Sequence, residues 1–310
     1  MNKENLFAGI VLLATTGIVA AQQEPDLEYT PLLPRPAYEF GQGPRVVIDE
    51  AHHNFHTAGG RYQPFAELLR RDGYRVNGLG RRLSSDSLSD VEVLVIANAL
   101  NERNVKDWSL PTPSAFTTDE IAAVRVWVAK GGSLFLIVDH MPFPGAAGAL
   151  AHAFGVEFSN GFAVAKPTER PTTFIFRQGP GLRESAITQG RGDQEKVTEV
   201  ATFVGSAFKP PQDAIPVLVF SANFVSLKPD IAWQFTAATP KEPLEGWCQG
   251  AVMKVGDGRV AVFGEAAMFS AQLAGPGQQK MGMNAPEAKQ DHQLLLNVMH
   301  WLTRAKDMPD

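Results

Sequence analysis

The residues of this chain best suited to chemistry come directly after a short apolar run, Val46–Ile48. They are two carboxylates and three imidazoles within the segment 49–56, namely Asp49, Glu50, His52, His53 and His56. Carboxylate and imidazole groups are the usual ligands of zinc and harder transition ions, and the usual acids and bases of hydrolysis. This segment is therefore the first candidate for a functional site.

Three later apolar runs also end in polar residues. Val91–Ala97 is followed by Asn98, Ser133–Val138 by Asp139 and His140, and Val260–Phe263 by Gly264 and Glu265. Short apolar runs of this kind predict buried strands of a mostly parallel sheet, and open α/β sheets bind ligands at the carboxyl ends of their strands. We therefore expect these polar groups to lie along one edge.

The segments between the runs carry helix and hairpin signals. The expected helices are 62–71, a helix opened by the capping box 117–120 and stopped at 131–132, then 145–154, 266–273 and 291–304. Gly256-Asp257-Gly258 predicts a hairpin between two strands. The alternation predicts an α/β fold, flavodoxin-like or amidotransferase-like, with a mostly parallel sheet and helices on both faces.

Two parts of the chain depart from this alternation. The proline-bearing segment 22–43 predicts an extended leader and not a packed element. Residues of about 156–245 contain short apolar runs broken by proline and glycine, which indicates an irregular, strand-rich insertion attached to the sheet. We expect a single α/β domain over 44–305.

The N-terminus has the features of a secretory signal peptide. Lys3 precedes an apolar run from Leu6 to Ala21, and Val19-Ala20-Ala21 supplies small residues for cleavage, so Gln22 would begin the mature chain. The run is short for a membrane span. We expect residues 1–21 to be removed and the mature protein to be periplasmic or secreted, with no stable membrane insertion.

Composition excludes several classes of partner and chemistry. The 310 residues carry a net charge of -5 without a basic block, which argues against nucleic acid as a partner. The one cysteine, Cys248, lies in an apolar stretch and allows no intramolecular disulfide. The chain also has no Gly-x-Ser-x-Gly elbow and no phosphate-loop signature.

One hypothesis is a divalent metal such as zinc that activates water for hydrolysis of a carbohydrate or other polar substrate. Its candidate ligands are His52, His53 and His56. The candidate catalytic residues are Glu265 and Asp139, as base or ligand, and His140, which with His53 would be a ligand or general acid.

Two other interpretations stay open. The polar groups could bond to one another and to backbone, and so only order the loops. They could also bind a polar ligand such as a sugar without a metal, with Phe55, Phe143, Phe162 or Phe269 as stacking faces. The polar candidates for ligand binding are Glu50, Asn54, Asn98 and His292, the last of which opens a helix and could reach the same edge.

Three stretches, 46–56, 139–143 and 264–272, resemble signatures of an uncharacterised family of exported bacterial proteins. The plan of the chain also resembles the class I glutamine amidotransferase-like fold, in the branch of the gliding-motility and intraflagellar-transport domains. Asn297 and Trp301-Leu302 match the last helix of that branch. Amidotransferases carry a nucleophilic cysteine where Asp139-His140 stands here, so the resemblance does not imply their activity; the gliding and ciliary relatives imply a binding role.

Metal analysis discriminates between a hydrolase and a non-catalytic ligand- or protein-binding module of the cell envelope. Stoichiometric zinc, manganese or iron in the purified mature protein, lost on His53→Ala or Glu265→Ala, is the outcome expected for the metal-assisted enzyme. Absence of metal, with both variants keeping full stability and ligand binding, would favour the module.

Overall fold

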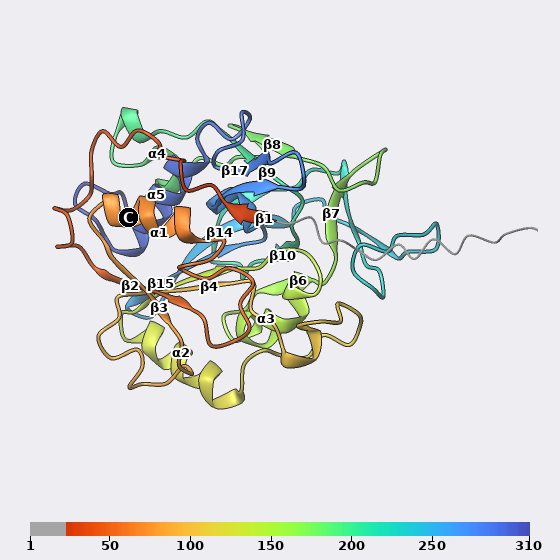
Figure 1. Ribbon diagram of the computed structural model, residues 1–310, viewed down its shortest axis with the longest axis horizontal. Helices are drawn as coiled ribbons and strands as arrows, with labels where there is room; N and C mark the ends of the chain where they lie inside the picture. The colour runs from red at the N-terminus through yellow and green to blue at the C-terminus, as the bar shows by residue number, and fades with distance from the viewer. Residues whose placement is uncertain (1–22) are drawn as a thin grey trace, which may run out of the picture.

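The computed structural model describes residues 23–310, so the predicted signal peptide lies outside the described residues. The chain forms a mixed α/β fold built on one nine-stranded sheet (Figure 1). Its strands, in spatial order, are β3 (Arg75–Leu79), β2 (Arg45–Asp49), β4 (Val93–Ala97), β5 (Ser133–Ile137), β15 (Gly258–Phe263), β14 (Cys248–Val255), β10 (Ala207–Lys209) and β6 (Glu157–Ser159), with β11 (Ile215–Val219) also paired to β14.

The first five strands of this order are parallel, and the remainder are antiparallel. The main helices are α1 (Gln63–Arg71), α2 (Thr118–Ala129), α3 (Phe143–His152) and α5 (Asp291–Leu302). The mixed α/β class with parallel strands is confirmed. Residues 156–285 form mostly short strands, so few helices are available to cover the sheet. Complete helical cover of both faces therefore stays a prediction.

Alternate residues of the strands belong to two separate hydrophobic clusters. Val46 and Ile48 pack with residues of α1 and α5, whereas Val47 packs with residues of α2 and α3. Figure 1 shows α2 and α3 below the sheet and α1 close to α5. Successive side chains of a strand point to opposite faces of the sheet. The position of each polar residue along its strand therefore decides on which face its side chain lies.

Local signals act as expected in two elements that support the site. Thr117 and Glu120 form the predicted capping box, which fixes the start of α2. Gly256, with φ of 58°, makes the turn between β14 and β15 that the sequence predicts. Both elements deliver a strand to the centre of the sheet, namely β5 after α2 and β15 after the hairpin.

The insertion supplies edge strands and small sheets. Its strands β6, β10 and β11 extend the large sheet. The other strands form two small sheets. One contains β7 (Phe162–Ala165), β12 (Phe224–Leu227) and β13 (Lys241–Pro243), and the other contains β8 (Phe174–Arg177) and β9 (Glu199–Thr202). The short helices are α4 (Ala186–Gln189), η1 (Glu102–Asn104), η2 (Asp193–Glu195) and η3 (Ala267–Phe269).

Two predictions on local structure are wrong. The expected helix 266–273 is one turn, η3, followed by strand β16 (Ala271–Ala274), which pairs with β17 (Gln279–Gly282). The leader is packed, because β1 (Gln23–Pro25) pairs with β16, and Tyr29 and Tyr38 contact the core. Tertiary pairing outweighs local propensity in both segments.

A close approach at Gly258 provides a test of how β15 is placed. A Cβ added there would meet the backbone oxygens of Val128 and Gly132, at the end of α2. We expect Gly258→Ala to lower the free energy of unfolding by about 1–3 kcal/mol, because backbone cannot yield as a side chain does. Gly277→Ala, where an added Cβ has no neighbour within 4 Å, is the control. Equal urea midpoints for the two variants would contradict this packing.

Candidate functional site

The polar ends of the parallel strands meet, and the register places two of the acids at one level. Phe263 of β15 pairs with Ile137 of β5. Glu265 and Asp139 each lie two residues further on, so they come next to each other. The charge of Asp139 acts on the carboxyl of Glu265, as expected for neighbouring groups.

His52 lies on the α2 side of the sheet, between two carboxylates. Its Nδ1 is 2.8 Å from Oδ2 of Asp49, and its Nε2 is 2.9 Å from Oε1 of Glu120. Burial by itself lowers the pKa of His52, but the hydrogen bonds and charges of both acids outweigh it and raise the pKa. Asn54 adds a 3.0 Å hydrogen bond to Asp49.

Glu120 completes this buried network. Burial alone would raise its pKa, but hydrogen bonds from Thr117 and His52 lower it to about 2. Arg82 lies 3.2 Å from its second oxygen. Both ring nitrogens of His52 are thus occupied by carboxylates, so His52 has a structural role and Asn54 supports it.

The other two candidate metal ligands have different surroundings. His53 is exposed, with φ of 48°, and His56 is buried on the α1 side. Within residues 23–310, no group of three or more His, Cys, Asp or Glu side chains is arranged to hold a metal ion. The three histidines therefore do not form the single ligand set that their spacing suggested.

Two predicted ligand-binding residues have neighbours other than the acid pair. Glu50 accepts the N–H of Ala58 at 2.8 Å and covers Gly78 of β3, where an added Cβ would be 2.5 Å from its carboxyl carbon. His292 is half-buried on α5; burial and then the charge of Arg71 lower its pKa. In the described chain no hydrogen bond joins either side chain to Asp139 or Glu265.

Asn98 connects the end of β4 to both sides of the site. Its Oδ1 accepts the N–H of Asp139 at 2.8 Å, so its Nδ2 faces Nδ1 of His56 at 3.2 Å and donates to it. His56 therefore carries its proton on Nε2. Burial, then the charge of Arg61, lowers the pKa of His56 to about 3, so the ring is neutral.

Glu265 is buried behind Asp139. Its oxygens accept the N–H groups of Ala267 at 2.9 Å and Met268 at 2.6 Å, which holds η3. Burial, then the charge of Asp139, raises its pKa well above the ordinary value. Tyr62, which donates to the carbonyl of Ala266 at 3.0 Å, has its pKa raised by burial and by the same two acids.

His140 is held in one orientation with one nitrogen open. Its Nδ1 donates to the carbonyl of Met141 at 2.7 Å, and its ring stacks on Phe162 at 4.5 Å. Nε2 makes no hydrogen bond within residues 23–310, although His140 as a whole is only 8% exposed. Oδ1 of Asp139 accepts the N–H of His140 at 2.7 Å, and its Oδ2 likewise makes no hydrogen bond in that part of the chain. Two neighbouring residues thus each keep one acceptor atom without a hydrogen-bond partner in the described chain, namely Nε2 of His140 and Oδ2 of Asp139.

An aromatic surface that the sequence did not indicate lies beside His140. Trp233 is 42% exposed, has φ of 67° and lies 4.6 Å from the His140 ring; half-buried Trp108 lies 6.0 Å from it. Both are in loops without periodicity. Of the expected stacking faces, Phe143, Phe162 and Phe269 are buried in the core, and only Phe55 is partly exposed.

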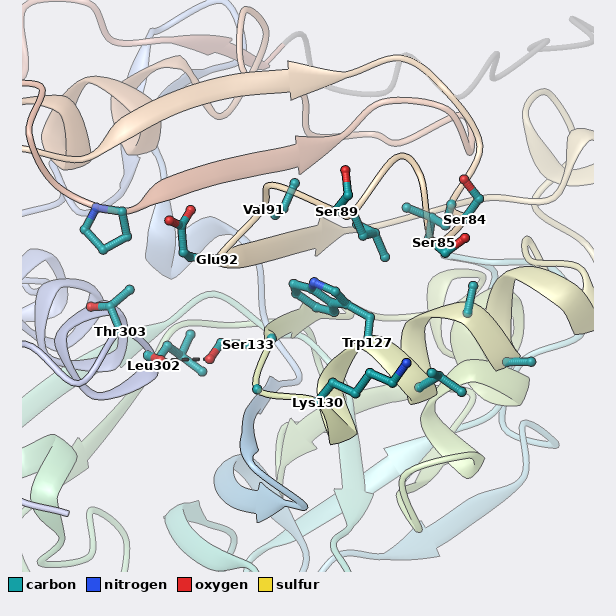
Figure 2. A pocket seen from close by; sticks show the side chains of 18 of the residues that line it. Ser84, Ser85, Ser89, Val91, Glu92, Trp127, Lys130, Ser133, Leu302 and Thr303 are labelled. Carbon is teal, nitrogen blue, oxygen red and sulfur yellow. Dashed lines mark hydrogen bonds between the residues drawn. The ribbon is translucent and has the colours of Figure 1, made fainter.

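A pocket of about 880 Å³ lies at the opposite end of the parallel strands (Figure 2). Ser133 and Glu92, at the starts of β5 and β4, line it with Trp127 and Lys130 of the α2 end and Thr303 after α5. Its walls lack the acid and imidazole groups described above. We therefore place the candidate site at the carboxyl ends and not in this pocket.

Comparison with known proteins supports the fold and leaves the family open. No family model matches the chain, and no curated protein matches it. The mmIFT52 N-terminal domain is similar with a TM-score of 0.58 and 15% identity, over 84% of this chain and 98% of that domain. At this identity the similarity shows the fold alone.

Weaker similarities concern a ThuA-like protein from Bacteroides uniformis and a GMP synthase subunit from Thermoplasma acidophilum. The first has a TM-score of 0.48 and 11% identity, over 88% of this chain and 94% of that one. The second has a TM-score of 0.40 and 12% identity, over 82% and 91%. Membership of the exported bacterial family stays a prediction.

The His52 network yields a stability prediction. We expect His52→Ala to lower the free energy of unfolding by about 3–5 kcal/mol, since it leaves buried Asp49 and Glu120 without their shared partner. The folded pKa of His52 is raised above 6.5, so its contribution is fully present below pH 6.5 and is lost as the pH rises through the folded value.

Urea unfolding of the wild type and of His52→Ala, near pH 6 and near pH 9, measures this contribution. The difference in unfolding free energy between the two proteins should be larger at the lower pH. His152→Ala, on the exposed side of α3, is the control and should show no such trend. A difference that grows with pH would contradict the assigned network.

Proposed function

We propose that the protein is an exported hydrolase of a carbohydrate or other polar substrate, with Asp139 and His140 at the centre of its site. The observation that carries the proposal is the pair of open acceptors, Nε2 of His140 and Oδ2 of Asp139, at the end of a central strand. Export rests on the N-terminal sequence, and within residues 23–310 no helix is long and apolar enough to cross a membrane.

His140 is the candidate general base. Because Nδ1 is hydrogen-bonded to the Met141 carbonyl, the neutral ring carries its proton there and Nε2 can take a proton from water. The hydroxide oxygen would then bond to the electrophilic carbon of the substrate, the bond from that carbon to the leaving oxygen would break, and the His140 imidazolium would return its proton to that oxygen. The contact with Phe162 keeps the imidazole from rotating away.

Glu265 and Asp139 divide their roles by environment. Burial and the charge of Asp139 raise the pKa of Glu265 and favour its protonated form, whereas Asp139 is the partly exposed member of the pair. Glu265 then holds a proton behind the site, and Asp139 orients the substrate or stabilises positive charge on His140. Both ring nitrogens of His52 are bonded to carboxylates, so His52 is not available as a metal ligand. We therefore propose hydrolysis by acid–base catalysis without a metal.

The exposed indole of Trp233 favours a ring-shaped ligand. Sugar rings present apolar C–H faces that stack on aromatic side chains, while their hydroxyl groups bond to polar neighbours. Trp233 and Trp108 lie beside His140, so a bound ring would lie within reach of the open acceptors.

A non-catalytic ligand- or protein-binding module is the second candidate. It is favoured by the extent to which the polar strand ends satisfy one another, as in Asp49, His52 and Glu120. The same aromatic surface would then bind a partner without any reaction.

We expect the purified mature protein to hydrolyse at least one member of a panel of p-nitrophenyl glycosides and esters. His140→Gln should reduce kcat at least about 100-fold, since a general base contributes that much. Asp139→Asn should act in the same direction, and Trp233→Ala should mainly raise KM. His152→Gln is the matched control with wild-type rates. Turnover unchanged in His140→Gln would remove the catalytic assignment, and binding without turnover would favour the module.

A further inference from the structure

Arg61 is a partly buried cation without an acid partner in the described chain. Its guanidinium carbon lies 3.8 Å above the ring centre of Phe55, and its Nη1 donates to the Phe55 carbonyl at 3.3 Å. No carboxylate within residues 23–310 forms an ion pair with it. Buried charges are normally paired, and burial lowers the pKa of Arg61, so this cation lacks compensation within the protein.

Two N–H donors in this region are buried without an acceptor. One is Nε of Arg61, and the other is Nε2 of His56, which carries the ring proton because Asn98 donates to Nδ1. A buried donor that finds no acceptor costs free energy comparable to its desolvation. The His56 and Arg61 side chains both contact Phe55, so the two donors belong to one region.

From these observations we propose that Arg61 and His56 form a binding subsite for a carboxylate group of the ligand. A carboxylate has two oxygens in one plane, which suit the forked donors of a guanidinium, and it supplies the missing negative charge. The neutral His56 ring adds a donor that does not titrate near neutral pH.

The subsite is joined to the proposed catalytic pair by a continuous aromatic layer. The Phe55 ring lies 5.7 Å from the half-buried ring of Trp108, which lies 6.0 Å from His140. Phe143 is buried beneath this layer and supports it, with its ring 5.7 Å from Phe55 and 5.9 Å from His140. A ligand with its carboxylate at Arg61 and its ring on this layer would reach Asp139. The substrate class that follows, which rests on the proposed function, is an acidic carbohydrate such as a uronic acid.

The loop that carries both donors is fixed to the strand ends. Ser270 donates its hydroxyl to the carbonyl of Arg61, and the hydroxyl of neighbouring Tyr62 donates to Ala266. Arg61 is therefore positioned by the same segment, 264–270, that carries Glu265. A flexible surface arginine would not have this support.

Calorimetric titration of the full mature chain with sodium glucuronate, glucose and glucose 6-phosphate at equal ionic strength tests the subsite. We expect glucuronate to bind at least about tenfold more tightly than glucose, as charge-assisted hydrogen bonds require. Arg61→Gln should abolish this preference, and His56→Gln should reduce it. Arg81→Gln, which removes an exposed charge after β3, is the matched control and should retain it.

Arg61→Lys keeps the charge and the apolar stem, so it serves if Arg61→Gln does not fold; it should lose part of the preference. Equal binding of glucuronate and glucose to the wild type, a preference that survives in Arg61→Gln, or tighter binding of glucose 6-phosphate would overturn the carboxylate assignment. Hydrolysis of neutral glycosides without a glucuronate preference would overturn it while leaving the proposed hydrolase intact. A glucuronate preference that persists in an inactive protein would support the subsite and contradict the hydrolase.

Discussion

The parallel pairing of β5 with β15 is the constraint on which the site depends. Because Ile137 stands opposite Phe263, the residues two positions beyond, Asp139 and Glu265, must lie at one level. Two carboxyl groups held this close do not ionise independently, and the more buried one keeps its proton. The register of hydrogen bonds between two strands thus brings the charge of Asp139 next to Glu265, where it adds to the effect of burial and raises the pKa of Glu265.

Strand register brings Asp139 and Glu265 together, but the alternation of side chains along β2 separates the acids of the segment 49–56. Asp49 follows Val47 toward α2, and Glu50 follows Ile48 toward α1, so two adjacent acids are separated by the sheet itself. The histidines after them separate as well. His52 is a shared partner of buried carboxylates, His53 is exposed, and His56 is a neutral donor. One short sequence motif therefore supplies three different environments.

Aromatic contacts, partly exposed and partly buried, connect the separate polar groups. Phe55 lies under Arg61, and Phe143 and Trp108 continue the contact to His140 and Trp233. An aromatic layer with polar groups at its two ends is suited to a ring-containing ligand with an acidic substituent. The network around His52 packs on the same side of the sheet, because the His52 ring contacts Phe116, which belongs to the same hydrophobic cluster as Phe143.

The sequence by itself determined the elements whose signals are local: the capping box at Thr117, the hairpin at Gly256, and the apolar strands with polar ends. These depend on interactions a few residues apart, which sequence spacing records. Tertiary structure decided the rest. The contact of His52 with Glu120, 68 residues away, the packing of the leader through β1, and the position of Trp233 depend on which distant segments fold together. Residue types and local spacing carry no record of such pairings, because they are fixed only when the sheet assembles.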